Sequence, residues 1–197
     1  MDCKFIEEPF GMFCDEHVNC FTLESLNYMM NSLGFQLISS NIIYDSYSNI
    51  TAANPCISTI WKKINKPIIR KKVSQKAEEA LKGYINGNVQ ALENAQGIIN
   101  SIGGEEKLAV WGVGNHLSML FANTELMQKN IVKFYDSDMK KCSLTLMNKK
   151  ITAFTDDDIA NGVVESILIS TYTAQIPIKV VLDKYKSKCN VYTLYND

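Results

Sequence analysis

The sequence predicts an α/β fold with a parallel sheet and helices on both of its faces. Short apolar segments typical of strands recur over residues 105–197, at 107–113, 131–137, 149–154, 166–172 and 190–195. Segments with helical patterns separate them at three points, 115–129, 155–162 and 174–185. Strands that alternate with helices in this way are typical of βαβ units, whose crossovers are right-handed.

The first 50 residues predict a helix followed by a strand. Thr22 is a suitable helix N-cap, and Gly34 is a suitable stop after the helix. Apolar residues follow the cap at helical spacing, at Leu23, Leu26, Met29, Met30 and Leu33. The segment FQLISSNIIY (35–44) then has the composition of a strand. We interpret residues 1–50 as the tail of a larger sheet.

Residues 51–104 predict a helical connector between that tail and the C-terminal domain, residues 105–197. Pro55 and Pro67 indicate an irregular connection, in which we expect a short helix around Trp61. An apolar stripe near the helical period predicts one long helix over residues 71–101, ended by the glycine pair at 103–104.

Composition and charge exclude several classes of protein. Hydrophobic residues make up 46% of the 197 residues, which is enough for a buried core, and a net charge of −1 gives no reason to expect nucleic acid or membrane as a partner. The six cysteines contain no C-x-x-C pair, so we expect free thiols in the cytoplasm and no metal site.

Gly112 and Gly114 mark the candidate binding site, in AVWGVGNHLSML (109–120), where a strand turns into a helix. They supply two of the three glycines of a dinucleotide-binding fingerprint, and Leu117 occupies the third position. Asp136, at the end of the next strand, stands where such folds contact a ribose hydroxyl. The pattern therefore predicts a Rossmann-like domain, and the turn either binds a ligand or only reverses the chain.

Other polar residues should lie at the same edge of the sheet. Asn115 and His116 begin the helix, where His116 could donate to a phosphate or point into solvent. Ser170, Thr171 and Tyr172 follow another strand, so they should face the same crevice or begin a helix.

Two motifs together resemble the SAM-dependent sugar C-methyltransferase family. EHVNCFTLESLNYMMNSLGF (16–35) is similar to the segment Glu-His-x-x-Tyr-Phe-(Ser/Thr)-x-x-Ser-Leu…Gly-Phe, which closes the catalytic domain of these enzymes. The segments at 108–126, 131–138 and 166–178 resemble the Rossmann-like C-terminal domain of the family, and also the nucleotide-sugar-binding domain of sugar O-acyltransferases.

The resemblance implies a role in deoxysugar biosynthesis. In that family a base removes a proton beside a keto group of a nucleotide-linked sugar, and the enolate takes the methyl group of S-adenosylmethionine. His17 occupies the position of the family's histidine, the residue type best suited to act as a base near neutral pH. Glu16 occupies the position of its acidic neighbour. The C-terminal domain would help to hold the sugar nucleotide.

The sequence departs from the family in three ways. Cys20 replaces the usual aromatic hydroxyl residue, residues 140–151 lack a Pro-Gly-Thr element, and no SAM-binding glycine loop precedes residue 20. We therefore expect a chain that is inactive alone and binds S-adenosylmethionine only if the missing N-terminal half is supplied. A homodimer is possible.

Two alternatives stay open. One is a small NAD(P)-binding protein. The other is a non-catalytic interaction module that pairs through the strand edge at residues 36–44.

Overall fold

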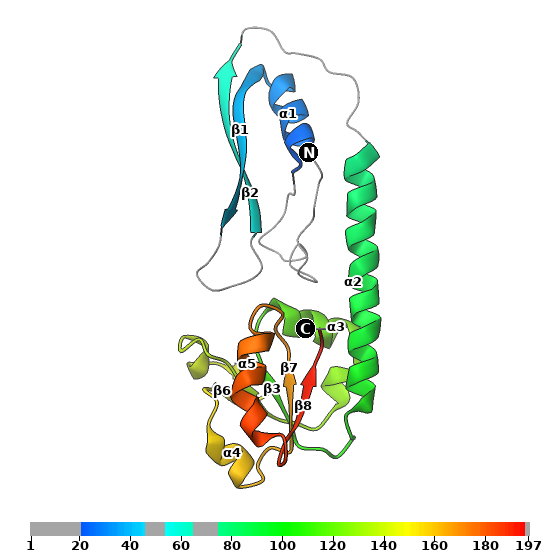
Figure 1. The fold of residues 1–197 in the computed structure, drawn as a ribbon, viewed down its shortest axis with the longest axis vertical. Coiled ribbons are helices and arrows are strands. Elements are labelled where there is room, and N and C mark those ends of the chain that lie inside the picture. The colour runs from blue at the N-terminus through cyan, green and yellow to red at the C-terminus, as the bar shows by residue number, and fades with distance from the viewer. Residues whose placement is uncertain (1–20, 46–53, 65–74, 196–197) are drawn as a thin grey trace. The chain divides into compact units, whose positions relative to one another are not determined.

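The computed structural model describes residues 21–45, 54–64 and 75–195. The chain divides into two compact units, Met1–Asn88 and Val89–Asp197 (Figure 1). His17 and Glu16 lie outside the described residues, so their roles stay predictions. Within the described ranges, no helix is long and apolar enough to cross a membrane.

The first unit begins with helix α1, Leu23–Ser32, whose two ends match the predicted signals. The Thr22 Oγ1 atom accepts a hydrogen bond from the amide of Ser25 at 3.1 Å, and the Ser25 hydroxyl accepts from the amide of Thr22 at 2.9 Å. This reciprocal arrangement is a capping box closed by serine. Gly34 has a φ of 82°, the left-handed conformation that commonly ends a helix.

Strands β1, Phe35–Asp45, and β2, Asn54–Lys63, form an antiparallel pair. The predicted strand is confirmed, whereas the predicted short helix around Trp61 is wrong, because Trp61 lies in β2 opposite Leu37. Strand β2 contains β-branched residues, which favour strands. Its pairing with β1 at ten positions outweighs the preference of Pro55 for an irregular connection.

Helix α2 runs from Gln75 to Ser101, within the range predicted for it. Its glycines, at 83, 87 and 97, do not interrupt it. In the second unit its last turns bury Ala95 and Ile99 against the sheet. Of the predicted apolar stripe, Ile99 is buried in this way, whereas Leu81 and Ile85 are exposed.

The second unit is built on a six-stranded sheet with the order β5-β6-β4-β3-β7-β8. Five strands are parallel: β3, Leu108–Trp111; β4, Ile131–Tyr135; β6, Lys149–Thr152; β7, Ser166–Ile169; and β8, Asn190–Thr193. Chain order runs outward from β3 in one direction, to β4 and β6, and then in the other, to β7 and β8. This is the Rossmann arrangement, and its switch point lies between β3 and β7.

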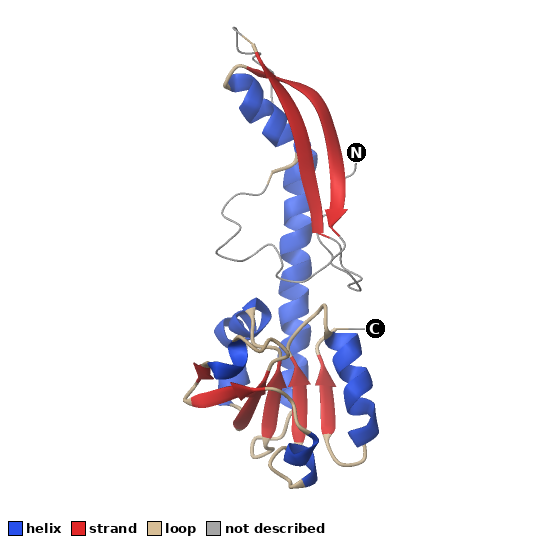
Figure 2. Ribbon diagram, turned by 90° about the vertical axis from the view of Figure 1, so that its left-hand side faces the viewer, coloured by secondary structure: helices blue, strands red, loops and turns tan. Residues whose placement is uncertain are grey.

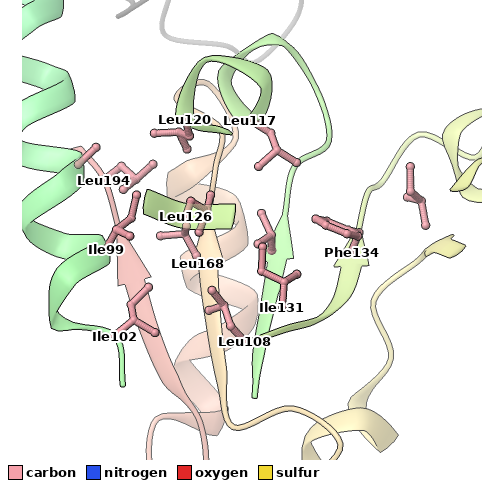
Figure 3. Close-up of a cluster of buried hydrophobic side chains, with 13 residues drawn as sticks. Ile99, Ile102, Leu108, Leu117, Leu120, Leu126, Ile131, Phe134, Leu168 and Leu194 are labelled. Carbon is pink, nitrogen blue, oxygen red and sulfur yellow. The ribbon is translucent and has the colours of Figure 1, made fainter. Parts of the chain in front are cut away.

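Helices cover both faces of this sheet, as the sequence predicts (Figure 2). Leu108 and Val110 of β3 pack with α2, with α3, Asn115–Asn123, and with the 3₁₀ helix Glu125–Gln128 (Figure 3). Ala109 and Trp111 point the opposite way and pack with α4, Asp156–Ala160, and α5, Gln175–Leu182, which continues as the 3₁₀ helix Asp183–Tyr185. The predicted fold class is confirmed.

A hairpin replaces a crossover helix between β4 and β6. The 3₁₀ helix Lys141–Ser143 leads into β5, Thr145–Leu146, which runs antiparallel to β6. Met147 and Asn148 join the two strands with positive φ values of 49° and 60°, as a type I′ turn requires.

Candidate functional site

The Gly112–Gly114 loop lies at the carboxyl end of β3, beside the switch point. Gly112 has a φ of 111°. A Cβ atom there would lie 3.2 Å from the Cβ atom of Thr171 and 3.3 Å from the Ser170 hydroxyl. Both the backbone conformation and the lack of space therefore require glycine at position 112.

Ser170 holds this loop against β7. Its hydroxyl donates to the carbonyl of Gly112 at 2.6 Å and lies 3.2 Å from the carbonyl of Trp111. Ser170 is 1% exposed. Its hydroxyl is thus engaged with the loop, and Thr171 packs against Gly112 from the same strand end.

Asp136 holds the loop from the side of β4. One oxygen, Oδ2, accepts a hydrogen bond from the amide of Val113 at 2.8 Å, and Oδ1 accepts from the amide of Asp138 at 2.8 Å. The residue is buried. The structure therefore places Asp136 next to the loop, as predicted, and gives its carboxylate a role in shaping the loop. A contact with ribose stays a prediction.

Lys141 completes the site, although no sequence motif indicated it. Its ammonium donates to the carbonyl of Val113 at 2.7 Å and to Oδ2 of Asp136 at 3.2 Å. It also lies 3.9 Å from the position that a Cβ atom on Gly114 would occupy. The sequence signal is weak, because Lys141 is one of two adjacent lysines in a turn after β4.

Gly114 precedes helix α3 and leaves its start open. Its φ of −157° is extended backbone that any residue adopts, so conformation does not require glycine here. A side chain at this position would meet nothing within 4 Å except the Lys141 ammonium. Gly114 also offers no side chain to cap α3, and Asn115, the first helical residue, is exposed. An anionic group fits this space, because a helix start and an ammonium both favour negative charge.

The remaining predicted residues gather beside the loop. His116 Nδ1 lies 2.8 Å from the hydroxyl of Tyr195, and the two rings meet edge to face. Tyr172 meets Tyr195 in the same way, with ring centroids 5.1 Å apart. The Gln175 side chain holds the backbone of Tyr195 through hydrogen bonds of 2.7 and 3.1 Å. The sequence analysis did not single out Tyr195, which comes after the last strand.

A second polar cluster lies away from the loop, between β4 and α4. The Asp158 Oδ2 atom accepts hydrogen bonds from the Lys133 ammonium, from the Tyr135 hydroxyl at 2.8 Å and from the Thr155 hydroxyl at 3.1 Å. Burial raises the pKa of Asp158, but the hydrogen bonds from Lys133 and Tyr135 outweigh it and hold that pKa below its ordinary value. Burial and Asp158 raise the pKa of Tyr135, so its hydroxyl stays a donor.

The comparisons with known proteins find solved structures of low sequence identity. No family model matches the chain. No curated protein matches it. Three similar solved structures are UDP-D-quinovosamine 4-dehydrogenase from Vibrio fischeri, RSP in complex with β-NADH, and RSP described as a Rex-family repressor.

The degree of similarity is low in each case. The dehydrogenase is 21% identical over 47% of this chain and 80% of its own, with a TM-score of 0.34. The NADH complex is 13% identical over 59% of this chain and 68% of its own, with a TM-score of 0.38. The repressor is 10% identical over 58% of this chain and 60% of its own, with a TM-score of 0.36. At these values the similarity carries no argument about function.

Proposed function

We propose that the chain is related to SAM-dependent sugar C-methyltransferases and that its second unit binds a nucleotide-linked sugar at the Gly112–Gly114 loop. The observation that carries this proposal is the open backbone at Gly114, beside the Lys141 ammonium and the start of α3. A diphosphate, which joins the two halves of a sugar nucleotide, suits such a space through its negative charge.

The proposed family role rests on the two sequence motifs. Residues 16–35 resemble the end of the catalytic domain, and residues 108–178 resemble the C-terminal domain of the same family. Within this proposal His17 is the base and Glu16 orients it or contacts the substrate. S-adenosylmethionine would be bound by a catalytic half that is not among the described residues, and the second unit would hold the substrate.

Gly114→Ala is expected to abolish the stabilisation by sugar nucleotides. UDP-glucose or dTDP-glucose at about 100 times its Kd should stabilise the unsubstituted protein by about 2.7 kcal/mol, measured as a rise in Tm. The added methyl group fills the space beside Lys141, so the variant should keep its own Tm and show no rise. If neither sugar nucleotide raises the Tm of the unsubstituted protein, the proposed function is wrong.

NADH in the same measurement tests the main alternative. Leu117 replaces the third glycine of the dinucleotide fingerprint and is buried, and Asp136 already accepts a hydrogen bond from the amide of Val113 in the loop. We therefore expect no rise in Tm with NADH at millimolar concentration. A rise with NADH and none with sugar nucleotides would favour an NAD(P)-binding protein.

Lys141→Gln is expected to weaken the binding of UDP-glucose by about tenfold, because one charge-assisted contact to phosphate is lost. Lys140→Gln is the matched control, since Lys140 is the exposed neighbour in the same turn. Isothermal titration at low and moderate salt measures both. Lys141→Arg should retain most of the affinity because it keeps the charge. Equal affinities for the Lys141→Gln and Lys140→Gln variants would exclude a role for Lys141 in binding.

A further inference from the structure

A hollow of about 770 Å³ opens within the second unit, between α2 and the ends of β7 and β8. Helix α2 forms one wall, with Gly97 and Ile98 on it, and Tyr172, Leu194 and Tyr195 form the other. It is open to solvent, because most of the α2 residues that line it are exposed. Of the predicted site residues, Tyr172 lines it and those of the glycine loop do not.

The hollow offers flat apolar surface and hydroxyl groups together. Tyr172 and Tyr195 stand edge to face at 84°, so their ring planes differ in direction. Leu194 is buried and packs with Ile99 of α2 (Figure 3). Aromatic faces stack on rings, while tyrosine hydroxyls form hydrogen bonds, so the walls suit a ring that carries polar substituents.

The described residues that line the hollow offer no positive charge to a phosphate. Among the described residues that line it, Glu93 is the only charged one, and Asn94 and Ser101 add polar groups on the same wall. The exposed carboxylate of Glu93 can accept hydrogen bonds from hydroxyl groups. The hollow therefore suits a neutral ring with hydroxyl groups, and the phosphate belongs beside Lys141.

His116 connects the hollow to the phosphate-binding space. It lies two residues after Gly114, in the first turn of α3, and its Nδ1 atom lies 2.8 Å from the hydroxyl of Tyr195 on the hollow wall. A phosphate beside Gly114 and a ring covalently attached to it would thus reach adjoining sites.

We propose that this hollow is the subsite for the hydroxyl-bearing ring joined to the phosphate of the ligand. The inference rests on the proposed function and adds the place where the ring binds. Two parts of a sugar nucleotide have this chemistry, the pyranose and the ribose of the nucleoside. The experiment distinguishes them.

Gly97→Leu tests the subsite by filling it. A Cβ atom on Gly97 meets nothing within 4 Å, and leucine is a better helix former than glycine, so the variant should fold. Gly87→Leu is the matched control on the same helix, because Gly87 is equally unobstructed and does not line the hollow. Circular dichroism and Tm confirm the fold of both variants. Isothermal titration of the full chain then measures UDP-glucose, UDP and glucose 1-phosphate.

Gly97→Leu is expected to weaken the binding of UDP-glucose by about tenfold or more, whereas Gly87→Leu leaves it within about twofold. An equal loss for UDP assigns the hollow to the nucleoside, and an equal loss for glucose 1-phosphate assigns it to the sugar. Unchanged binding of UDP-glucose by the Gly97→Leu variant overturns the subsite and leaves the proposed function standing. No binding by the unsubstituted protein overturns both.

Discussion

Gly112→Ala is expected to lower the free energy of unfolding by about 2–4 kcal/mol. Part of this loss comes from the φ of 111°, which an alanine adopts only with strain. The rest comes from the new methyl group, which would lie 3.2 Å from the Cβ atom of Thr171 and 3.3 Å from the hydroxyl of the buried Ser170. Urea denaturation followed by circular dichroism measures the change.

Gly114→Ala provides the control for that measurement, two residues along the same loop. Its φ is extended and its surroundings are open, so the free energy of unfolding should change by less than about 0.5 kcal/mol. The two glycines thus have different roles: the fold requires Gly112, and the proposed ligand requires Gly114. Equal losses of stability in the two variants would contradict this division.

Asp158→Ala is expected to cost about 2–4 kcal/mol of stability, because it leaves the Lys133 ammonium and the Tyr135 hydroxyl without their acceptor. The side chain of Asp158 is 12% exposed and that of Lys133 is 25% exposed, so water replaces the lost contacts only in part. Asp156→Ala, in the same first turn of α4, is the control. Asp156 pairs with Lys184 at 3.2 Å, but both side chains are 60% exposed, so its removal should change stability little.

The same carboxylate makes stability depend on pH. Because the pKa of Asp158 is lower in the folded than in the unfolded protein, its contribution is fully present above the unfolded pKa. It is lost as the pH falls from about 4 through the lower folded pKa. Between about pH 5 and pH 2, the unsubstituted protein should therefore lose more stability than the Asp158→Asn variant, as measured by Tm. Parallel curves would show that Asp158 does not contribute.

The sequence predicted the second unit well because its signals are local. An apolar segment of four to seven residues followed by a helical pattern is enough to assign each parallel strand, and Gly112 stands at the end of the first one. Strand β2 was missed because its conformation depends on pairing with β1, and Pro55 and Trp61 do not indicate that pairing. Strand β5 is two residues long and turns at Met147, a residue type that rarely adopts positive φ.

The sequence predicted where in the fold the candidate site lies, but only some of the residues that form it. Gly112, Asp136 and Ser170 follow strand ends, where the fold class alone brings residues together. Lys141 enters the site through a turn, where no periodicity fixes the direction of a side chain, and Tyr195 lies just beyond β8, although the sequence predicts a strand as far as residue 195. The engagement of Asp136 and Ser170 by loop atoms also depends on tertiary distances, which a motif does not contain.

The hydrogen bond from Ser170 to Gly112 spans 58 positions of the chain, and it forms where β7 pairs with β3. Contacts of such long sequence separation must close a large loop before they add stability, so they favour slow folding. The hydrogen bond that fixes the conformation of the glycine loop consequently forms only when both halves of the sheet have assembled. A molecule that recognises this shape would bind completed sheets and leave partly folded chains untouched.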